Sequence, residues 1–264
     1  MKVARSGEHH ELQNLTLNIA LEGDFDDIHT RGDNSGCLPT DTMKNTVYAL
    51  AGQTEEIETS EAFGQRLAAH FLVSNPQVLR VTIDIFEHFW KRMKFDGREH
   101  AHSFVKGSGE KRTAKIVAWR DGVTVEAGVE DLIVLKTTQS GFVGFIKDEY
   151  TTLPEVTDRI FSTAIKATWT YGKAGDASDN LFYGIRQMIL KVFADHESLS
   201  VQHTLYAIGE AILERFAEVR EISFSLPNIH CLPVDLTKFG MQNDNRIFVP
   251  TDEPHGLIEA KLCR

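Results

Sequence analysis

The order of apolar and polar residues along the chain predicts strands and helices that follow each other in pairs. Residues 15–23 (LTLNIALEG) alternate apolar and polar side chains, which is typical of a half-buried strand. Residues 40–52 (TDTMKNTVYALAG) predict a short helix, with Thr40 as its N-cap. Residues 60–76 carry an apolar stripe at helical spacing that predicts a second helix. This half of the chain therefore begins with strand, helix, helix.

Two predicted strand segments complete the first half. Residues 78–90 (VLRVTIDIFEHFW) predict a strand whose buried face would carry Leu79, Val81, Ile83 and Ile85. Residues 101–119 predict a further strand pair, because the glycine-rich stretch GSGEKR in its middle favours a bend or turn.

The second half repeats the same order of elements. Strands are predicted at 123–138 and 159–171, helices at 180–196 and 201–216, and strands again at 219–226 and 230–236. The order strand, strand, helix, helix, strand, strand thus occurs twice, except that the first copy lacks its first strand. This order predicts an α+β fold, with an antiparallel sheet and helices on one face.

Such a repeat suggests tandem duplication. We expect a first repeat at 1–120, with a shortened first strand, and a second at 121–264. Because no low-complexity linker separates the repeats, we expect one compact unit. A sheet with free edges and one uncovered face also favours assembly into a homo-oligomer.

Charge and composition narrow the classes of function. The formal net charge of −10 argues against non-specific nucleic-acid binding, which depends on clustered Lys and Arg. Three widely spaced cysteines without a CxxC motif favour a reducing compartment over a disulfide framework. No run of 18 apolar residues occurs, so no membrane association is predicted. We expect a cytoplasmic protein.

Three residues suggest chemistry on their own. If Thr40 caps a helix, its hydroxyl and the free backbone N–H of Asp41 would lie at the positive end of that helix, which favours anions. Asn228 and His230 are two residues apart, so a strand would point both side chains to one face. Histidine can exchange protons near neutral pH. Taken alone, Thr40 could simply cap a helix, and His230 could be a hydrogen-bonded histidine at a strand end.

Several longer segments carry a resemblance to a known family. They are TDTMKNT (40–46), SGFVGFIKDEYTTL (140–153), TDRIFST (157–163), SVQHTLY (200–206), SLPNIHCLPVDL (225–236) and PHGLI (254–258). From about residue 12 to its end, the chain resembles the urate oxidases (uricases), which are cofactor-free enzymes of the tunnelling fold (T-fold). The resemblance implies tandem T-fold repeats that assemble into a barrel or tunnel, as a homotetramer with active sites at subunit interfaces. It also implies oxidation of urate by dioxygen, without a cofactor, to 5-hydroxyisourate and hydrogen peroxide.

The resemblance also assigns residues to substrate binding. Arg159 matches the arginine that binds urate, and its planar donors suit the edge of a flat anion. Gln202 matches the amide at the other end of that edge, with the backbone N–H of Val201 beside it. Phe142 matches the ring on which urate stacks. The matching apolar lining positions are Leu153 and Ile258.

The resemblance also implies catalytic roles for Thr40, Asn228 and His230. The threonine matching Thr40 reaches the purine from the neighbouring subunit and exchanges a proton with it, and the amide matching Asp41 meets the C8 oxygen. The asparagine matching Asn228 holds dioxygen and later water over the ring. The histidine matching His230 belongs to the proton relay.

A catalytic lysine is part of the family pattern. It lies on the first strand in a YGK-type stretch, whereas MKVARSGEHHEL matches the end of that strand and the turn after it. We therefore do not assign its role to Lys2. Lys44 shares a helical face with Thr40, although the lysine at this position is not the family's base, and a solvated or structural role is expected.

Three alternatives remain open at this point. Without the lysine, the chain could bind urate or a related purine and not turn it over. A T-fold protein could instead act on a pterin. A metal enzyme is a third reading, because His100 and His102 alternate on a strand and His203 or His230 could complete a site.

Overall fold

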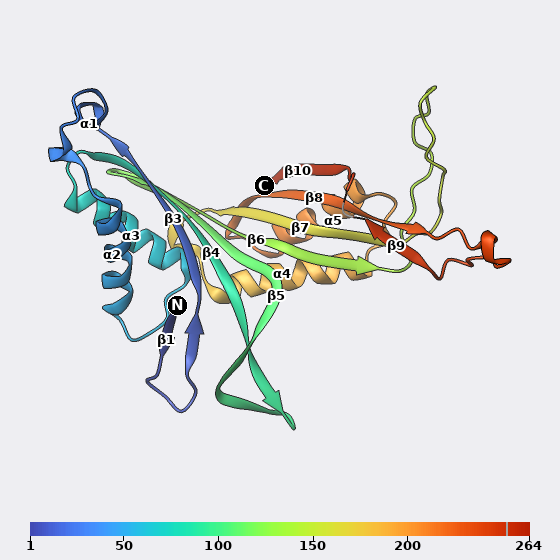
Figure 1. The fold of residues 1–264 in the computed structure, drawn as a ribbon, viewed down its shortest axis with the longest axis horizontal. Coiled ribbons are helices and arrows are strands. Elements are labelled where there is room, and N and C mark those ends of the chain that lie inside the picture. Colours follow the sequence, from blue (N-terminus) through green and yellow to red (C-terminus); the bar gives the residue numbers. More distant parts are fainter. Residues whose placement is uncertain (252) are drawn as a thin grey trace. The chain divides into compact units, whose positions relative to one another are not determined.

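The computed structural model describes residues 1–251 and 253–264 (Figure 1). Contacts within the chain group them into two compact units, Met1–Val129 with Thr168–Phe182, and Glu130–Ala167 with Tyr183–Arg264. The units follow packing, and they differ from the division at residue 120 that the repeated order of elements predicts. That division, a statement about duplication, stays a prediction.

The first unit is an antiparallel sheet with helices packed on it. Its elements in chain order are β1 (Lys2–Ala4), β2 (Glu11–Gln13), β3 (Leu15–Gly23), α1 (Asp26–Thr30), a 3-10 turn (Asn34–Gly36), α2 (Thr40–Gly52), α3 (Ser60–Ser74), β4 (Val78–Phe95) and β5 (Arg98–Trp119). β3 pairs with β4 and β4 with β5, and α3 packs against β4 and β5. The buried face of α3 includes Phe63, Leu67 and Phe71.

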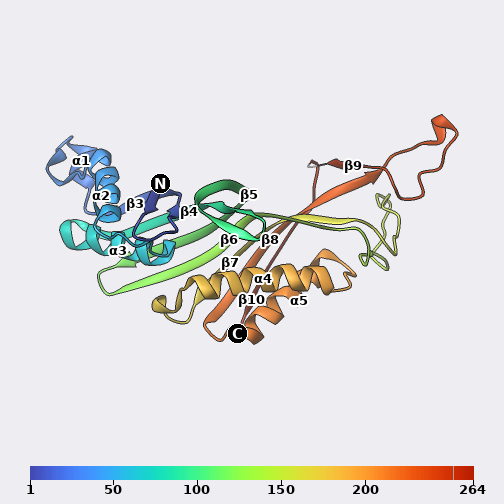
Figure 2. The same ribbon diagram turned by 90° about the horizontal axis from the view of Figure 1, so that it is seen from below.

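Three elements contribute residues to both units: β6 (Gly122–Lys136), β7 (Phe161–Tyr171) and α4 (Asp179–Asp195). The second unit adds α5 (Val201–Arg215), β8 (Val219–Pro233), β9 (Phe248–Thr251) and β10 (Leu257–Cys263), with 3-10 turns at Thr237–Phe239 and, in the first unit, Ala174–Asp176. Its strands run in the order β10, β8, β7, β6, with β9 paired to β8. Figure 2 shows α5 on one face of these strands, where it packs against β8 and β10.

These observations confirm the predicted α+β class, with an antiparallel sheet and helices on one face. The strand at 15–23 has the predicted bounds, and the helix predicted to follow Thr40 as its N-cap begins one residue earlier, at Thr40 itself. The buried face of α5 includes Val201, Leu205, Ile208 and Ile212. Among the residues that the structure describes, no helix is both long and apolar enough to cross a membrane.

The prediction for the buried face of β4 is wrong at Leu79. Val78 is fully buried, whereas Leu79 is 56% exposed. The cause is a β-bulge: Glu22 of β3 pairs with Arg80, but Gly23 pairs with Val78, so Leu79 has no partner residue. One extra residue reverses the alternation of the strand.

The glycine-rich stretch of β5 is also not a turn. Residues 98–119 form one continuous strand, in which the single residue Phe89 of β4 lies opposite residues 107–110. The stretch makes a bulge, and a Cβ on Gly107 would lie 3.1 Å from the carbonyl oxygen of Phe89. Glycine here permits a close approach of two strands.

The two strands predicted at 219–226 and 230–236 are a single strand, β8. Pro227 ends the pairing with β10, and from His230 onward β8 pairs with β9 instead. Between them the Asn228 N–H donates to the Gly256 carbonyl at 2.9 Å. The backbone therefore continues as a strand because each part finds a partner.

A buried ion pair lies in the first unit. The Arg112 guanidinium donates to Glu61 Oε2 at 2.7 Å and to Asp179 Oδ1 at 2.6 Å, and its Cζ lies 4.5 Å from the centroid of the Phe182 ring. The Arg112 and Glu61 side chains are 3% and 0% exposed. Nearby, burial raises the pKa of Glu87, which accepts a hydrogen bond from Ser60. The buried charges of Arg112 and Glu61 thus compensate each other, whereas the Asp179 carboxylate is 59% exposed.

We expect Glu61→Gln to lower the free energy of unfolding by about 3–5 kcal/mol, because Arg112 would keep its charge in the core and lose one carboxylate. Denaturant unfolding at neutral pH measures the change. The control is Asp195→Asn, which removes the exposed ion pair with Lys191 and should cost at most about 0.5 kcal/mol. Equal losses in both variants would contradict a special role for the buried pair.

Candidate functional site

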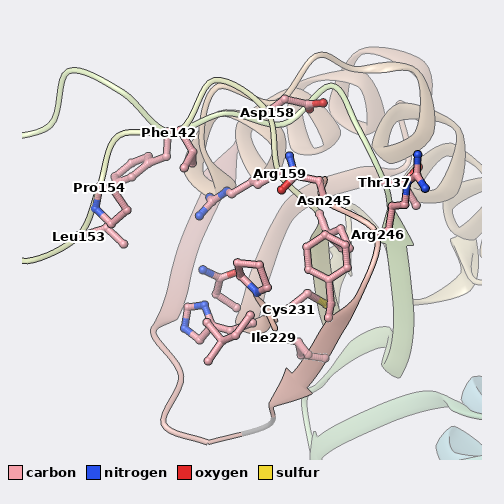
Figure 3. A pocket seen from close by; sticks show the side chains of 17 residues that line it. Thr137, Phe142, Leu153, Pro154, Asp158, Arg159, Ile229, Cys231, Asn245 and Arg246 are labelled. Carbon is pink, nitrogen blue, oxygen red and sulfur yellow. The ribbon is translucent and has the colours of Figure 1, made fainter. Parts of the chain in front are cut away.

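A cavity of about 490 Å³ lies in the second unit, between the segment that follows β6 and the strand β8 (Figure 3). Its wall comes from three stretches of chain: residues 137–160, residues 228–233 of β8, and residues 245–248. The lining residues are Thr137, Phe142, Leu153, Pro154, Val156, Asp158, Arg159, Ile160, Asn228, Ile229, His230, Cys231, Leu232, Pro233, Asn245, Arg246 and Phe248.

Backbone hydrogen bonds fix the first of these stretches. The N–H of Phe142 donates to the Val156 carbonyl at 2.7 Å and the N–H of Val156 donates back at 3.1 Å. The N–H of Arg159 donates to the Ser140 carbonyl at 2.7 Å. A Cβ on Gly141 would lie 3.0 Å from the Thr157 carbonyl oxygen, so glycine allows the two segments to come this close. Phe142 and Arg159 are thereby held beside each other.

Ser198 ties the same segment to the start of α5. Its N–H donates to the Gln139 carbonyl at 2.9 Å, and its carbonyl accepts from Gly141 N–H at 2.8 Å. Its buried hydroxyl donates to the Ser200 carbonyl at 3.0 Å and accepts from Thr204 Oγ1 at 2.8 Å. The first turn of α5 and the 139–142 segment are therefore one connected structure.

Arg159 is the most distinctive side chain of the cavity. Figure 3 shows its guanidinium in the middle of the pocket, pointing to the side of Phe142 and Leu153. Its Nε is buried and has no hydrogen-bond partner among the described residues. Burial lowers the pKa of Arg159. Buried donors are normally satisfied, so this one is suited to a ligand that brings an anionic or carbonyl edge.

The Phe142 ring offers an aromatic surface next to that arginine. It stacks on Phe145, with centroids 4.8 Å apart and an interplanar angle of 12°. The Cζ of Arg159 lies 5.6 Å from the Phe142 centroid. The protein itself therefore makes part of the contact that a flat molecule would make with this ring.

Asn228 and His230 reach the cavity from β8. Both line it, and so do Ile229 and Cys231 between and after them. His230 lies at the start of the pairing with β9, opposite Thr251. The structure thus brings five of the predicted site residues to one cavity: Phe142, Leu153, Arg159, Asn228 and His230.

Three other predicted residues of this unit lie outside that lining. Val201 and Gln202 are the first two residues of α5, whose N-cap is Ser200. The Ser200 hydroxyl accepts from His203 N–H at 3.0 Å. The N–H groups of Val201 and Gln202 have no intrahelical acceptor, because they lie in the first turn of the helix. Ile258 lies in β10, opposite Leu226.

Thr40 and Asp41 belong to the first unit, and Thr40 is not the N-cap of α2. The N-cap is Pro39, whose carbonyl accepts from Met43 N–H at 3.1 Å, so Thr40 is the first helical residue. The N-cap residue makes no side-chain hydrogen bond to the helix. The N–H groups of Thr40 and Asp41 still lie in the first turn, where helices leave donors free.

The Asp41 carboxylate accepts hydrogen bonds from two side chains of its own helix. It accepts from Lys44 Nζ at 2.5 Å and from Asn45 Nδ2 at 2.9 Å. Lys44 therefore pairs with Asp41 in this structure and not with Thr40, in agreement with a structural role for this lysine.

Of the histidines considered for a metal site, His100 and His102 have ring centroids 4.6 Å apart, and His203 contacts His196. Among the described residues, no group of three or more metal-ligating side chains is placed to hold an ion.

Sequence reasoning did not identify the part of the wall contributed by residues 245–248. Asn243 positions this segment: its amide donates to the Val234 and Ile247 carbonyls and accepts from the N–H groups of Arg246 and Ile247. Asp244 and Asn245 both have positive φ. An Asn-Asp-Asn run is a turn signal that could have indicated the loop, but not its place at a cavity.

Comparisons with known proteins agree with one another. The family model described as Uricase matches residues 1–117 and 125–259. The uricase of Arthrobacter globiformis is 41% identical over 264 residues, covering 100% of this chain and 85% of the relative. The uricase of Oryctolagus cuniculus is 37% identical, with coverage of 100% and 90%.

Solved structures give the same result. The crystal structure of uricase from Arthrobacter globiformis has a TM-score of 0.93 at 41% identity, covering 100% of this chain and 90% of that one. A uricase from Bacillus fastidious has a TM-score of 0.84 at 28% identity, with coverage of 94% and 81%.

We expect Ser198→Ala to lower the free energy of unfolding by about 1–3 kcal/mol, because the buried Thr204 hydroxyl would lose its acceptor. The double variant Ser198→Ala/Thr204→Val should lose less than the sum of the single variants, since no unpaired hydroxyl remains. Denaturant unfolding of all four proteins measures the cycle. Additive losses would mean that the two hydroxyls do not depend on each other.

Proposed function

Since the chain belongs to the uricase family, we propose that it is a urate oxidase, which oxidises urate with dioxygen to 5-hydroxyisourate and hydrogen peroxide. In this reaction urate gives two electrons to dioxygen, which takes up two protons and becomes hydrogen peroxide, and water supplies the hydroxyl group at C5. At the level of the site, the proposal rests on the buried Arg159 Nε, which has no hydrogen-bond partner among the described residues. This group lies beside Phe142 and in one cavity with Asn228 and His230.

Arg159 would bind the edge of the urate anion. Urate at neutral pH is flat and negatively charged, and a guanidinium offers two parallel donors to a carbonyl oxygen and an adjacent ring atom. Since none of the residues that the structure describes accepts a hydrogen bond from Nε, substrate binding would satisfy a donor that is otherwise buried at a cost.

The remaining binding residues would fix the plane and the rotation of the purine. Phe142 would stack on the ring, in exchange for part of its contact with Phe145 or Arg159. Gln202, with the Val201 N–H, would receive the edge opposite Arg159. Their place at the first turn of α5, tied to the Phe142 segment through Ser198, supports this pairing. Leu153 and Ile258 would be apolar neighbours.

Asn228 and His230 would act above the ring. An amide can hold dioxygen or water there, and an imidazole can pass protons near neutral pH. The urate dianion is a strong enough reductant to pass electrons to dioxygen directly. The protein would then supply orientation, deprotonation and exclusion of bulk water, and we propose that no cofactor takes part.

Thr40 and Asp41 would complete the site from a neighbouring subunit. The two residues belong to the first unit and do not line the cavity of the second. Together with family membership, this supports a homotetramer with active sites at subunit interfaces. There the Thr40 hydroxyl would exchange a proton with the purine, and the free N–H of Asp41 would meet the C8 oxygen.

The direct test follows the ultraviolet absorbance of urate in air, with the purified chain and no added cofactor, while peroxide is assayed in parallel. We expect loss of urate with equimolar peroxide. Tight urate binding without oxygen consumption would replace the proposal by a non-catalytic urate-binding protein. Weak urate binding with tight pterin binding would contradict it altogether.

Arg159→Ala should lower kcat/KM for urate by roughly two orders of magnitude, because loss of a buried charge-assisted pair costs about 2–5 kcal/mol. Steady-state kinetics measure the effect, and size-exclusion chromatography should show an unchanged oligomer.

Arg246→Ala is the matched control for that variant. Arg246 lines the same cavity, but Figure 3 shows its side chain directed to Thr137 and away from Arg159. Its loss should change kcat/KM much less. Equal effects of the two substitutions would refute the specific role of Arg159.

Thr40→Val should reduce kcat far more than it changes KM, because the hydroxyl is proposed to move a proton and not to provide affinity. A loss of about 10²–10⁴-fold in kcat is the usual range for such a group. If kcat and KM change in proportion, Thr40 would only position the substrate.

A further inference from the structure

Two histidine rings face each other where α4 ends and α5 begins. His196 Nε2 lies 3.2 Å from His203 Nδ1, the ring centroids are 4.3 Å apart, and the rings are inclined by 65°. At this distance one ring nitrogen donates and the other accepts, so the two rings share one proton. The proposed urate reaction gives this pair no role.

Both histidines are held by their backbones. The His196 N–H donates to the Val192 carbonyl at 2.9 Å, and the His196 carbonyl accepts from Lys136 Nζ. The His203 N–H donates to Ser200 Oγ, the N-cap of α5. The backbone positions from which the two rings meet are therefore fixed by the fold.

The surroundings of His196 favour its neutral form. Burial lowers the pKa of His196, and the neighbouring His203 and Lys136 act in the same direction, against Glu197. A neutral imidazole has a free lone pair, which is the form that binds metal ions. His196 is half-buried and His203 is exposed, so water can reach the pair.

We propose that His196 and His203 form a two-histidine site for one divalent transition-metal ion of the Zn²⁺, Ni²⁺ or Cu²⁺ class. Metal–imidazole bonds of about 2.0–2.1 Å in tetrahedral geometry place the two nitrogens roughly 3.3–3.4 Å apart, close to the separation found here. The ion replaces the shared proton, and the ring that carried this proton takes up a proton from water at its other nitrogen, so that both imidazoles bind as neutral ligands. Water completes the coordination, because no third ligating side chain is grouped with the pair among the described residues.

Lys136 sets the strength of this site. Its ammonium group donates a hydrogen bond to the carbonyl of His196. The positive charge of Lys136 would therefore repel a cation bound by the two histidines. Lys136→Gln should therefore bind the ion more tightly than the unaltered protein, whereas loss of either histidine should abolish binding. This opposite pair of effects is specific to a site at this position.

Calorimetric titration of the full chain with Ni²⁺ tests the proposal. We expect one ion per chain, affinity that falls as the pH is lowered because protons compete for the nitrogens, and loss of this binding in His196→Gln and in His203→Asn. The matched control is His100→Gln, which removes one ring from another close histidine pair, His100 and His102, and should leave the site unchanged.

Electron paramagnetic resonance of the Cu²⁺-loaded protein counts the ligands independently and needs no variant. Hyperfine splitting from two nitrogens supports the site. Binding that survives both histidine substitutions, loss of binding in His100→Gln, weaker binding in Lys136→Gln, or a spectrum without two nitrogen ligands would each overturn it. None of these outcomes depends on urate turnover.

Discussion

Ser198 makes the hydrogen bonds on which the cavity of the second unit depends. Its backbone joins residues 139 and 141, and its hydroxyl joins Ser200 and Thr204 at the start of α5. Through Ser140 the same network holds Arg159, and through the pairing of Phe142 with Val156 it holds the aromatic wall. Irregular backbone is placed here as firmly as in a strand, because its polar groups find partners within the protein. A guanidinium whose Nε has no hydrogen-bond partner among the described residues can then be kept in position within the cavity.

Much of the fold could be predicted from local pattern. The pattern predicts the strand at 15–23 to the residue and the helix at 40–52 to within one residue, because alternation and helical spacing are properties of the segment itself. The errors lie where a partner strand decides. Leu79 is exposed because β4 has a bulge opposite Glu22 and Gly23. Residues 107–112 stay in a strand because β5 forms a bulge opposite Phe89 of β4 and then resumes its pairing. The register between two strands cannot be predicted from the pattern of one strand alone.

The site was predicted to a different depth at different residues. Phe142, Leu153, Arg159, Asn228 and His230 lie together at one cavity, but their types and spacings alone would not have selected them. They were found by resemblance to a family. The predicted N-cap of α2 is wrong by one residue. Pro39 has no side-chain acceptor, but its carbonyl accepts the first backbone hydrogen bond of the helix. Residues 245–248 were missed because their place depends on a loop folded by Asn243.

The division of the predicted residues between two units gives the proposed function its geometric content. Arg159, Phe142, Asn228 and His230 share a cavity within one unit, while Thr40 and Asp41 belong to the other. A site completed between subunits would join binding and proton transfer only in the assembled protein. Free donors in the first turn of α2 suit such a role, because they are not used by the helix that carries them.

The measurement that tests this account most directly is a crystal structure of the chain grown with urate under anaerobic conditions. We expect the purine in the cavity of the second unit, stacked on Phe142, with one edge at the Arg159 guanidinium and its open face toward Asn228. Thr40 of a neighbouring subunit should reach the opposite edge. Urate bound elsewhere, or bound in this cavity without contact to Arg159, would contradict the account.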